Sequence, residues 1–438
     1  MTSSLAAIRG PTLSFRDDPF GKDLGECLEY ESDAVIVIEN GVIKAFGPAA
    51  EIEDQIPENT GVTQYRDSLI MAGFVDSHVH YPQTGIIGAY GEQLIDWLNN
   101  YTFIAEQAFD DKDYARAAAR LFLGEALRNG TTTCSVFCTV HPQSVDAFFE
   151  ESEKLGMRNI AGKVMMDRNA PAALTDTPQQ SYDDTCALIE RWHGNGRQLY
   201  SVTPRFAPSS SPEQMEMAGA VWQEHPGTYL QSHLSENRLE MTWVGELFPE
   251  RDGYLDVYDH YGQLGPRAIF GHGIHLTEAE WQRCHDTGTA IAHCPTSNLF
   301  LGSGLFDLRK ATRTARPVRV GLATDLGAGT SFSILQTLNE AYKVAQLNGY
   351  ALSAGQAFYL ATLGSARALY LDDRIGSIAA GMEADLVVLD LHATPLLEYR
   401  MSFCETLEET LFVLMTLGDD RAVRATYVNG SLVHSRQD

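Results

Sequence analysis

The stretch Phe74-Val-Asp-Ser-His78-Val-His80 decides how the rest of the chain is interpreted. An apolar run ends here in two imidazoles that are two residues apart. In a β-strand, residues i and i+2 point to the same face, so both side chains can reach one metal ion. The pair alone is weak evidence, because a histidine at the end of a strand is often only a hydrogen-bonded polar residue.

Three further apolar runs end in the same kind of side chain. They close with His233, His272 and Asp325. The spacings from His80 onward are 153, 39 and 53 residues, which suit about four, one and two strand–helix units. These counts place His78 and His80 on strand 1 of an eight-stranded barrel, and the other three residues on strands 5, 6 and 8. A (β/α)8 barrel carries its site at the carboxyl ends of its strands, so all five groups would meet at one mouth. If they were ordinary polar residues at strand ends, five coincidences would be needed.

The interior of the chain alternates between the two kinds of element that such a barrel needs. Residues 113–127 are rich in Ala and Leu and predict a helix that ends near Gly130. Residues 131–137 then have β character, and the same alternation returns over residues 268–292. Alternating strands and helices indicate a parallel sheet. We therefore predict a (β/α)8 TIM-type barrel.

Both ends of the chain carry a hairpin pattern instead. Asn40-Gly41 separates two strand-like runs near the start, and Asn429-Gly430 separates two more near the end. Asn-Gly between such runs is the strongest short-range hairpin signal. Two unrelated surface hairpins are the alternative, but short hairpins are marginal alone, so we prefer one small β-sandwich domain formed by both termini. The expected limits are residues 1–70 and 376–438 for this domain, with the barrel over 71–375.

Composition narrows the possible partners. The 438 residues include 32 Lys and Arg against 58 Asp and Glu, a formal net charge of −26, which argues against nucleic acid and anionic membranes. The longest apolar runs fall far short of the ~20 residues that cross a bilayer, and residues 1–10 show no secretory signal. The seven cysteines are scattered and odd in number, so we interpret them as reduced thiols. A cytoplasmic protein is expected.

The residue types at the predicted mouth suit hydrolytic zinc. Imidazole and carboxylate ligands with no thiolate are typical of a catalytic zinc that keeps one position open for water. Zinc lowers the pKa of that water toward ~7. Glu236 lies three residues after His233 and is the natural general acid and base. His272 could orient the attacking oxygen or stabilise charge on the substrate.

These residues resemble the amidohydrolase superfamily and, within it, the branch that deaminates guanine. The resemblance covers roughly residues 65 to 435 and is loose before them. The supporting stretches are His80-Tyr-Pro-Gln83, Leu94-Ile-Asp-Trp-Leu98, Tyr101-Thr-Phe-Ile-Ala-Glu106, Gly130-Thr-Thr-Thr133, Pro204-Arg-Phe206, Gln231-Ser-His-Leu-Ser-Glu-Asn237, Ala292-His-Cys-Pro-Thr-Ser-Asn298 and Gly321-Leu-Ala-Thr-Asp325.

The resemblance implies a full set of roles. It implies hydrolytic deamination of guanine to xanthine and ammonia, one Zn²⁺ per subunit and a homodimer. Glu236, His272 and Asp325 would be catalytic. The metal ligands would be His78, His80, His233 and Asp325.

The resemblance also implies which side chains hold the purine. Gln83 and Arg205 would hydrogen-bond the base, and Phe206 would pack near its ring. Arg205 offers a planar fork of donors, and Gln83 has both a donor and an acceptor. From the residues alone, a structural ion pair for Arg205, a solvent-facing place for Gln83, and simple packing for Phe206 and Trp97 stay open. The full substrate set is His80, Gln83, Trp97, Arg205, Phe206 and Glu236.

Two other functions stay open on the sequence. A related amidohydrolase could deaminate another amino-heterocycle, such as a triazine, adenine or a pterin. A non-catalytic scaffold of the same fold is the second alternative, but such a protein would have lost its ligands, and here every ligand and Glu236 are present. His293 and Asn298 are expected to be supporting or structural residues, and Cys294 to be inert.

Overall fold

The computed structural model describes residues 5–53, 56–57, 60–91 and 93–436. Within them the central unit is a parallel barrel in which each strand pairs with the next along the chain. The hydrogen-bonded order is β14-β13-β12-β11-β10-β8-β7-β6, and β9 pairs with β10 beside β8. The strands are β6 (Phe74–His80), β7 (Thr131–Phe137), β8 (Ile160–Gly162), β9 (Val164–Met165), β10 (Leu199–Pro204), β11 (Tyr229–Leu234), β12 (Ala268–His272), β13 (Ala290–His293) and β14 (Val320–Leu322).

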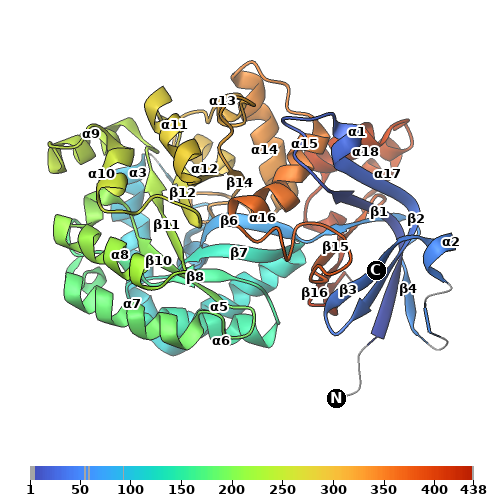
Figure 1. Cartoon of the computed structure of the whole chain (residues 1–438), viewed down its shortest axis with the longest axis horizontal. Helices are drawn as coiled ribbons and strands as arrows, with labels where there is room; N and C mark the ends of the chain where they lie inside the picture. Colours follow the sequence, from blue (N-terminus) through green and yellow to red (C-terminus); the bar gives the residue numbers. More distant parts are fainter. Residues whose placement is uncertain (1–4, 54–55, 58–59, 92, 437–438) are drawn as a thin grey trace.

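Helices surround these strands on the outside of the barrel (Figure 1). The predicted helix over 113–127 and strand over 131–137 are confirmed as α5 and β7. The predicted positions of the four strand ends are also confirmed. With β8 and β9 counted as one position, β6, β11, β12 and β14 are the first, fifth, sixth and eighth strands of the barrel. The surrounding helices are α5 (Lys112–Arg128), α6 (Pro142–Lys154), α7 (Pro178–Trp192), α8 (Pro212–Glu224), α9 (Arg238–Leu247), α10 (Tyr254–His260), α11 (Glu278–Thr287), α12 (Pro295–Phe300), α13 (Leu308–Ala311), α14 (Ile334–Leu347), α15 (Ala354–Tyr359) and α16 (Ser365–Ala368).

Side chains and loop backbone close the barrel between its first and last strands. Ser77 Oγ donates to the carbonyl of Leu322 at 2.8 Å, and the backbone N–H of Asp325 donates to the carbonyl of His78 at 3.0 Å. The buried carboxylate of Asp76 accepts from the Thr324 N–H at 3.0 Å and from its hydroxyl. The chain after β14 is thus fixed directly beside the two histidines of β6.

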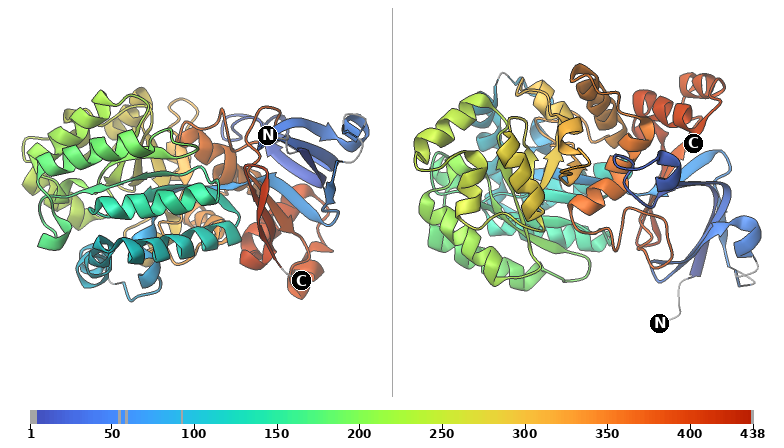
Figure 2. Two further views of the ribbon diagram at one scale, coloured as in Figure 1. Left: turned by 90° about the horizontal axis from the view of Figure 1, so that it is seen from below. Right: turned by 45° about the horizontal axis from the view of Figure 1, so that its top comes forward.

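The two ends of the chain form the second unit, as predicted, and their strands lie side by side in both views of Figure 2. They make one continuous eight-stranded sheet in the order β17-β16-β15-β5-β1-β2-β3, with β4 paired to β1. Apolar side chains from both halves of the sheet share one core, and the hydroxyls of Tyr65 and Tyr427 meet in it at 2.7 Å. The strands are β1 (Leu5–Phe15), β2 (Leu28–Glu39), β3 (Val42–Pro48), β4 (Val62–Gln64), β5 (Ser68–Ala72), β15 (Leu386–Asp390), β16 (Val423–Val428) and β17 (Ser431–Ser435).

The two Asn-Gly turns make the predicted hairpins and contact each other. Asn40 and Gly41 have φ of 53° and 83°, the left-handed values that a tight hairpin turn requires. A Cβ on Gly41 would lie 2.1 Å from Asn429 Oδ1, so only glycine fits where the turns meet. The remaining helices are α1 (Leu24–Cys27), α2 (Ala49–Ile52), α3 (Leu94–Trp97), α4 (Phe103–Glu106), α17 (Pro395–Met401) and α18 (Leu407–Leu417).

A buried ion cluster joins the amino ends of the barrel strands to this sheet. Arg158 and Arg197 precede strands β8 and β10, and Glu383 and Asp385 precede β15. Arg158 Nε donates to Glu383 at 2.7 Å, and Arg197 binds both carboxylates. The Asn429 N–H donates to Asp385 at 2.8 Å, so the C-terminal turn is tied to the same cluster. No helix in the described part of the chain combines the length and apolar character needed to cross a bilayer.

Candidate metal centre and active site

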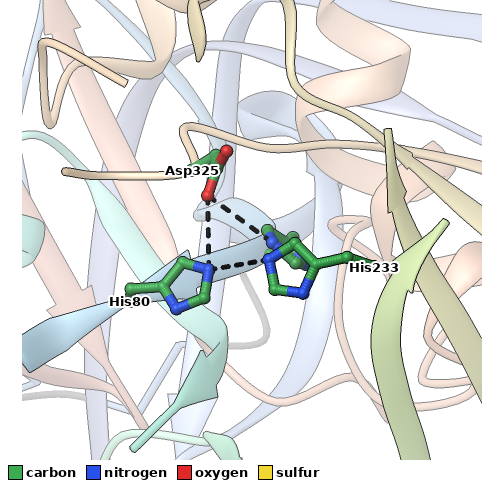
Figure 3. A group of neighbouring side chains, drawn as sticks. His80, His233 and Asp325 are labelled. Atoms are coloured by element: carbon green, nitrogen blue, oxygen red, sulfur yellow. Dashed lines mark hydrogen bonds and ion pairs between the residues drawn. The ribbon is translucent and has the colours of Figure 1, made fainter. Parts of the chain in front are cut away.

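Four predicted metal ligands converge at the mouth of the barrel that is formed by the carboxyl ends of its strands. One donor atom from each of His78, His80, His233 and Asp325 lies within 4.8 Å of all the others. Asp325 Oδ1 is 3.5 Å from His78 Nε2 and 3.4 Å from His80 Nε2. Figure 3 shows the labelled His80, His233 and Asp325 pointing toward one another. The structure thus brings together residues that the chain separates by up to 247 positions.

The hydrogen bonds around this cluster leave lone pairs directed into it. His233 Nδ1 is 2.6 Å from the carbonyl of Arg205, which can only accept, so the proton of this imidazole is on Nδ1. Its Nε2 lone pair then faces His80 Nε2 at 3.1 Å. Burial lowers the pKa of His80 and His233 well below the usual value, so both rings are neutral. Among the described residues, neither ring nitrogen of His78 has a hydrogen-bond partner. Neutral imidazoles and a carboxylate with free, convergent lone pairs fit a zinc ion.

His272 and Glu236 lie beside this cluster as a buried pair. His272 Nε2 is 3.4 Å from Glu236 Oε2 and 3.7 Å from Asp325 Oδ2. Burial opposes charge on the imidazole, but the Glu236 carboxylate raises the pKa of His272 well above its usual value. Burial raises the pKa of Glu236 to about 7. A carboxyl group that titrates near neutrality can both accept and return a proton.

The backbone at two of these positions is strained. His272 and Asp325 have φ of 73° and 49°, in the left-handed region that residues other than glycine rarely occupy. Asp325 is held there by its N–H bond to His78, and the His272 ring is held by a 2.8 Å contact between Nδ1 and Asn298 Oδ1. Strain of this kind is concentrated at functional sites, where the surroundings over-determine it.

A pocket opens beside the cluster. The substrate residues expected from the sequence all line it. Trp97 and Phe206 line the pocket and also pack in the core beside it. The lining is His80, Gln83, Leu94, Trp97, Leu98, Arg205, Phe206, His233, Glu236, His272, Leu301, Asp325 and Ala328.

Glu106 has no role predicted from the sequence, although it ends the stretch Tyr101-Thr-Phe-Ile-Ala-Glu106. It is completely buried, and its Oε2 accepts from Arg205 at 2.7 Å. The structural ion pair considered for Arg205 therefore exists, and Arg205 also lines the pocket. Glu106 and Arg205 are 99 residues apart, and no local pattern links them.

A second carboxylate with no role predicted from the sequence is Glu240. It accepts from the N–H of Glu236 at 2.9 Å and from the Tyr254 hydroxyl at 2.8 Å. Tyr258, one turn further along α10, donates to the carbonyl of His233 at 2.7 Å. Helix α10 thereby holds the backbone of both His233 and Glu236. The Asn-x-x-Glu spacing from Asn237 to Glu240 is a capping-box pattern that would have revealed part of this arrangement.

The remaining polar residues near β13 have supporting places. Asn298 contacts His272 as described, whereas His293 is buried against Phe306 with ring centroids 4.6 Å apart. Burial lowers the pKa of His293 to about 3, so the ring is neutral. The Cys294 thiol is buried and its pKa is raised to about 11 by that burial, so it is not a ready nucleophile.

The fold and this constellation define a hydrolase built on a (β/α)8 barrel, with a cluster of side chains that could hold a metal ion. A family model described as "Amidohydrolase family" matches residues 69–433, and the chain belongs to this family. It is 53% identical to guanine deaminase of Escherichia coli over 436 residues, which is 99% of this chain and 98% of that protein. The solved structure of the E. coli guanine deaminase superposes with a TM-score of 0.96 and covers 99% of this chain and 100% of that one.

A second relative carries a ligand. The crystal structure of guanine deaminase from C. acetobutylicum, with guanine bound in its active site, has a TM-score of 0.87 and 30% identity, and covers 98% of this chain and all of that one. A triazine hydrolase from an Arthrobacter source has a TM-score of 0.85 but only 20% identity, so that likeness concerns the fold alone.

Proposed function

We propose that this chain is a zinc-dependent enzyme that hydrolyses guanine to xanthine and ammonia. One observation carries the proposal: a cluster of metal-ligand donors, a buried proton carrier and an Arg–Gln pair line the same pocket, in a chain 53% identical to a guanine deaminase. Guanine is a small neutral ring, which agrees with a formal net charge of −26.

In this proposal His78, His80, His233 and Asp325 hold one zinc ion per chain. When bound, zinc supplies Lewis acidity and makes water nucleophilic at neutral pH. The protein supports the ligands from behind. The carbonyl of Arg205 fixes the tautomer of His233, and the Tyr258 hydroxyl holds the strand end that carries it.

The proton steps belong to Glu236. It takes a proton from the attacking water and delivers it to N3 of the purine, while the water oxygen adds to C2. It then takes the proton of the hydroxyl now on C2 and passes it to the amino group, so that the C2–N bond breaks, ammonia leaves and the C2 carbonyl of xanthine forms. The pKa near 7 suits both directions of transfer. The His272 imidazolium, 3.4 Å from Glu236 and 3.7 Å from Asp325, stabilises negative charge on the oxygen that adds.

The purine is positioned by groups on the opposite wall. Arg205 donates to ring acceptors, Gln83 hydrogen-bonds the ring edge, and Phe206 packs near the ring face. Trp97, fixed against Tyr101 and Phe300, completes the apolar wall. A flat apolar slot with a few convergent polar groups is what a planar base requires.

The direct test is ammonia release from a panel of rings: guanine, adenine, a pterin and an amino-triazine. We expect guanine to be turned over with the highest kcat/KM by a wide margin, and xanthine to appear in equal amount with ammonia. Faster turnover of another ring would replace guanine as the substrate. No turnover of any ring, together with no bound metal, would favour the non-catalytic scaffold.

We further propose that the protein is a cytoplasmic homodimer, with domain limits near residues 70 and 375. The seven cysteines are all free thiols, as a reducing compartment maintains. Light scattering should give twice the chain mass of 48.3 kDa.

A further inference from the structure

The buried carboxylate of Glu106 touches both polar groups that the proposed function assigns to purine recognition. Its Oε2 accepts from Arg205 at 2.7 Å, and its Oε1 accepts from the Gln83 amide at 3.5 Å. It lies on α4, at the end of a helical segment that begins with α3 and passes through a π-helical turn over Leu98–Thr102. The side chain is completely buried, so it acts only through these neighbours.

The chemistry of this contact fixes the orientation of the Gln83 amide. A carboxylate can only accept hydrogen bonds, and the amide has a donor end and an acceptor end. The NH₂ end must therefore face Glu106, which leaves Oε1 as the free end of a side chain that lines the pocket. A Cβ at Gly327 would lie 2.1 Å from Gln83 Oε1, so the missing side chain at Gly327 makes room for that oxygen. Among the described residues, no group donates a hydrogen bond to Gln83 Oε1.

The same Glu106 carboxylate neutralises the charge of the Arg205 side chain. Its positive charge is balanced within the wall, and the cation also lies 5.6 Å from the centre of the Phe103 ring. The pocket therefore does not demand an anionic substrate, and the remaining guanidinium N–H groups are still donors. The wall presents an acceptor at Gln83 and donors at Arg205, in one fixed arrangement.

We propose that Glu106 is a specificity-determining residue, which makes the site select a purine whose edge carries a ring N–H beside a carbonyl. This inference rests on the proposed function. Guanine has that edge at N1 and O6. In 2,6-diaminopurine the same edge has the reverse polarity, with an acceptor at N1 and an amino group at C6, although the 2-amino leaving group is unchanged. A buried polar mismatch of this kind is strongly rejected.

The test compares kcat/KM for guanine and 2,6-diaminopurine in the zinc-loaded full chain. In Glu106→Gln the new amide can donate as well as accept, so Gln83 can turn over. We expect the guanine to 2,6-diaminopurine ratio to fall by about 10- to 100-fold, the range for one mismatched buried hydrogen bond. The matched control is Glu151→Gln, which removes a largely buried carboxylate that pairs with Arg120 at 3.0 Å outside the pocket. Its ratio should equal that of the unchanged chain.

Each failure has its own signature. An unchanged chain that does not deaminate guanine would overturn the proposed function. An unchanged chain that deaminates guanine without preferring it over 2,6-diaminopurine, or a Glu106→Gln variant that slows both substrates equally, would overturn this inference alone.

A second variant covers the case in which Glu106→Gln does not fold. Gln83→Leu removes the acceptor itself and should lower the ratio by a similar factor; an unchanged ratio would overturn the inference. If both single variants fold, the double variant should show no further loss of selectivity beyond Gln83→Leu. A multiplicative loss would contradict a role of Glu106 through Gln83.

Discussion

The barrel holds a buried charged cluster at each end: one at the carboxyl ends of the strands, which we call the upper mouth, and one at their amino ends, which we call the lower end. The two clusters differ in how completely their polar groups are hydrogen-bonded. At the lower end, Arg158 and Arg197 bind Glu383 and Asp385 with close, multiple hydrogen bonds. At the mouth formed by the carboxyl ends of the strands, both ring nitrogens of His78 and Nδ1 of His80 lack hydrogen-bond partners among the described residues. Buried polar groups are normally paired, so a cluster with free lone pairs indicates a place for a ligand, and a fully paired cluster indicates structure.

The largest expected effect of a single change is on catalysis at the upper mouth. Glu236→Gln keeps the shape but removes the proton carrier, so kcat for guanine should fall by about 10² to 10⁴-fold. Zinc content should stay at one per chain, since Glu236 is not among the four convergent donors. Steady-state kinetics and metal analysis check both points, with Glu151→Gln as control. Normal turnover would remove Glu236 from the proton steps.

The lower cluster should respond in the opposite way. Glu383→Gln removes the carboxylate charge that pairs with Arg158 and leaves Arg197 paired with Asp385 alone. Breaking a buried ion pair typically costs about 3–5 kcal/mol in the free energy of unfolding. The kcat of the folded fraction should be unchanged, because this cluster lies at the amino ends of the strands. Denaturant unfolding followed beside kcat decides this. A loss of kcat without a loss of stability would break the contrast between the two ends.

A smaller effect on kcat is expected from a change at Tyr254, which supports the backbone of Glu236 through Glu240. Tyr254→Phe removes the hydroxyl that Glu240 accepts at 2.8 Å and loosens the loop that carries Glu236. A net loss of about 1 kcal/mol in positioning predicts a fall in kcat of roughly 5-fold, with KM for guanine unchanged. Tyr342→Phe, which removes a hydroxyl outside the site, is the matched control. A change in KM alone would place the effect on substrate binding instead.

The smallest effect is a shift with pH. The pKa of Glu236 is about 7, and its ionised form must accept the first proton. Activity should therefore fall as the pH drops through about 7 and level off above it. A profile of kcat/KM from acid to weakly alkaline pH should lose this limb in Glu236→Gln. An identical limb in that variant would assign it to another group.

Much of this arrangement could be predicted from the sequence, because it depends on local patterns. Apolar runs that end in His or Asp identify strand ends, and their spacing is set by the length of each strand–helix unit. The two Asn-Gly turns likewise predict the hairpins that contain them. Glu106 and Tyr258 could not be found in this way. Their roles depend on contacts that only the folded barrel creates, such as the pairing of Glu106 with Arg205 across 99 residues.

The most direct test of the account is a zinc titration of the chelated protein, with guanine turnover measured at each step. Activity should be lost on chelation, rise linearly with added zinc and saturate at one equivalent per chain, while Asp325→Asn should bind zinc more weakly. Full guanine turnover by metal-free protein would contradict the assignment of the upper cluster as a catalytic metal centre.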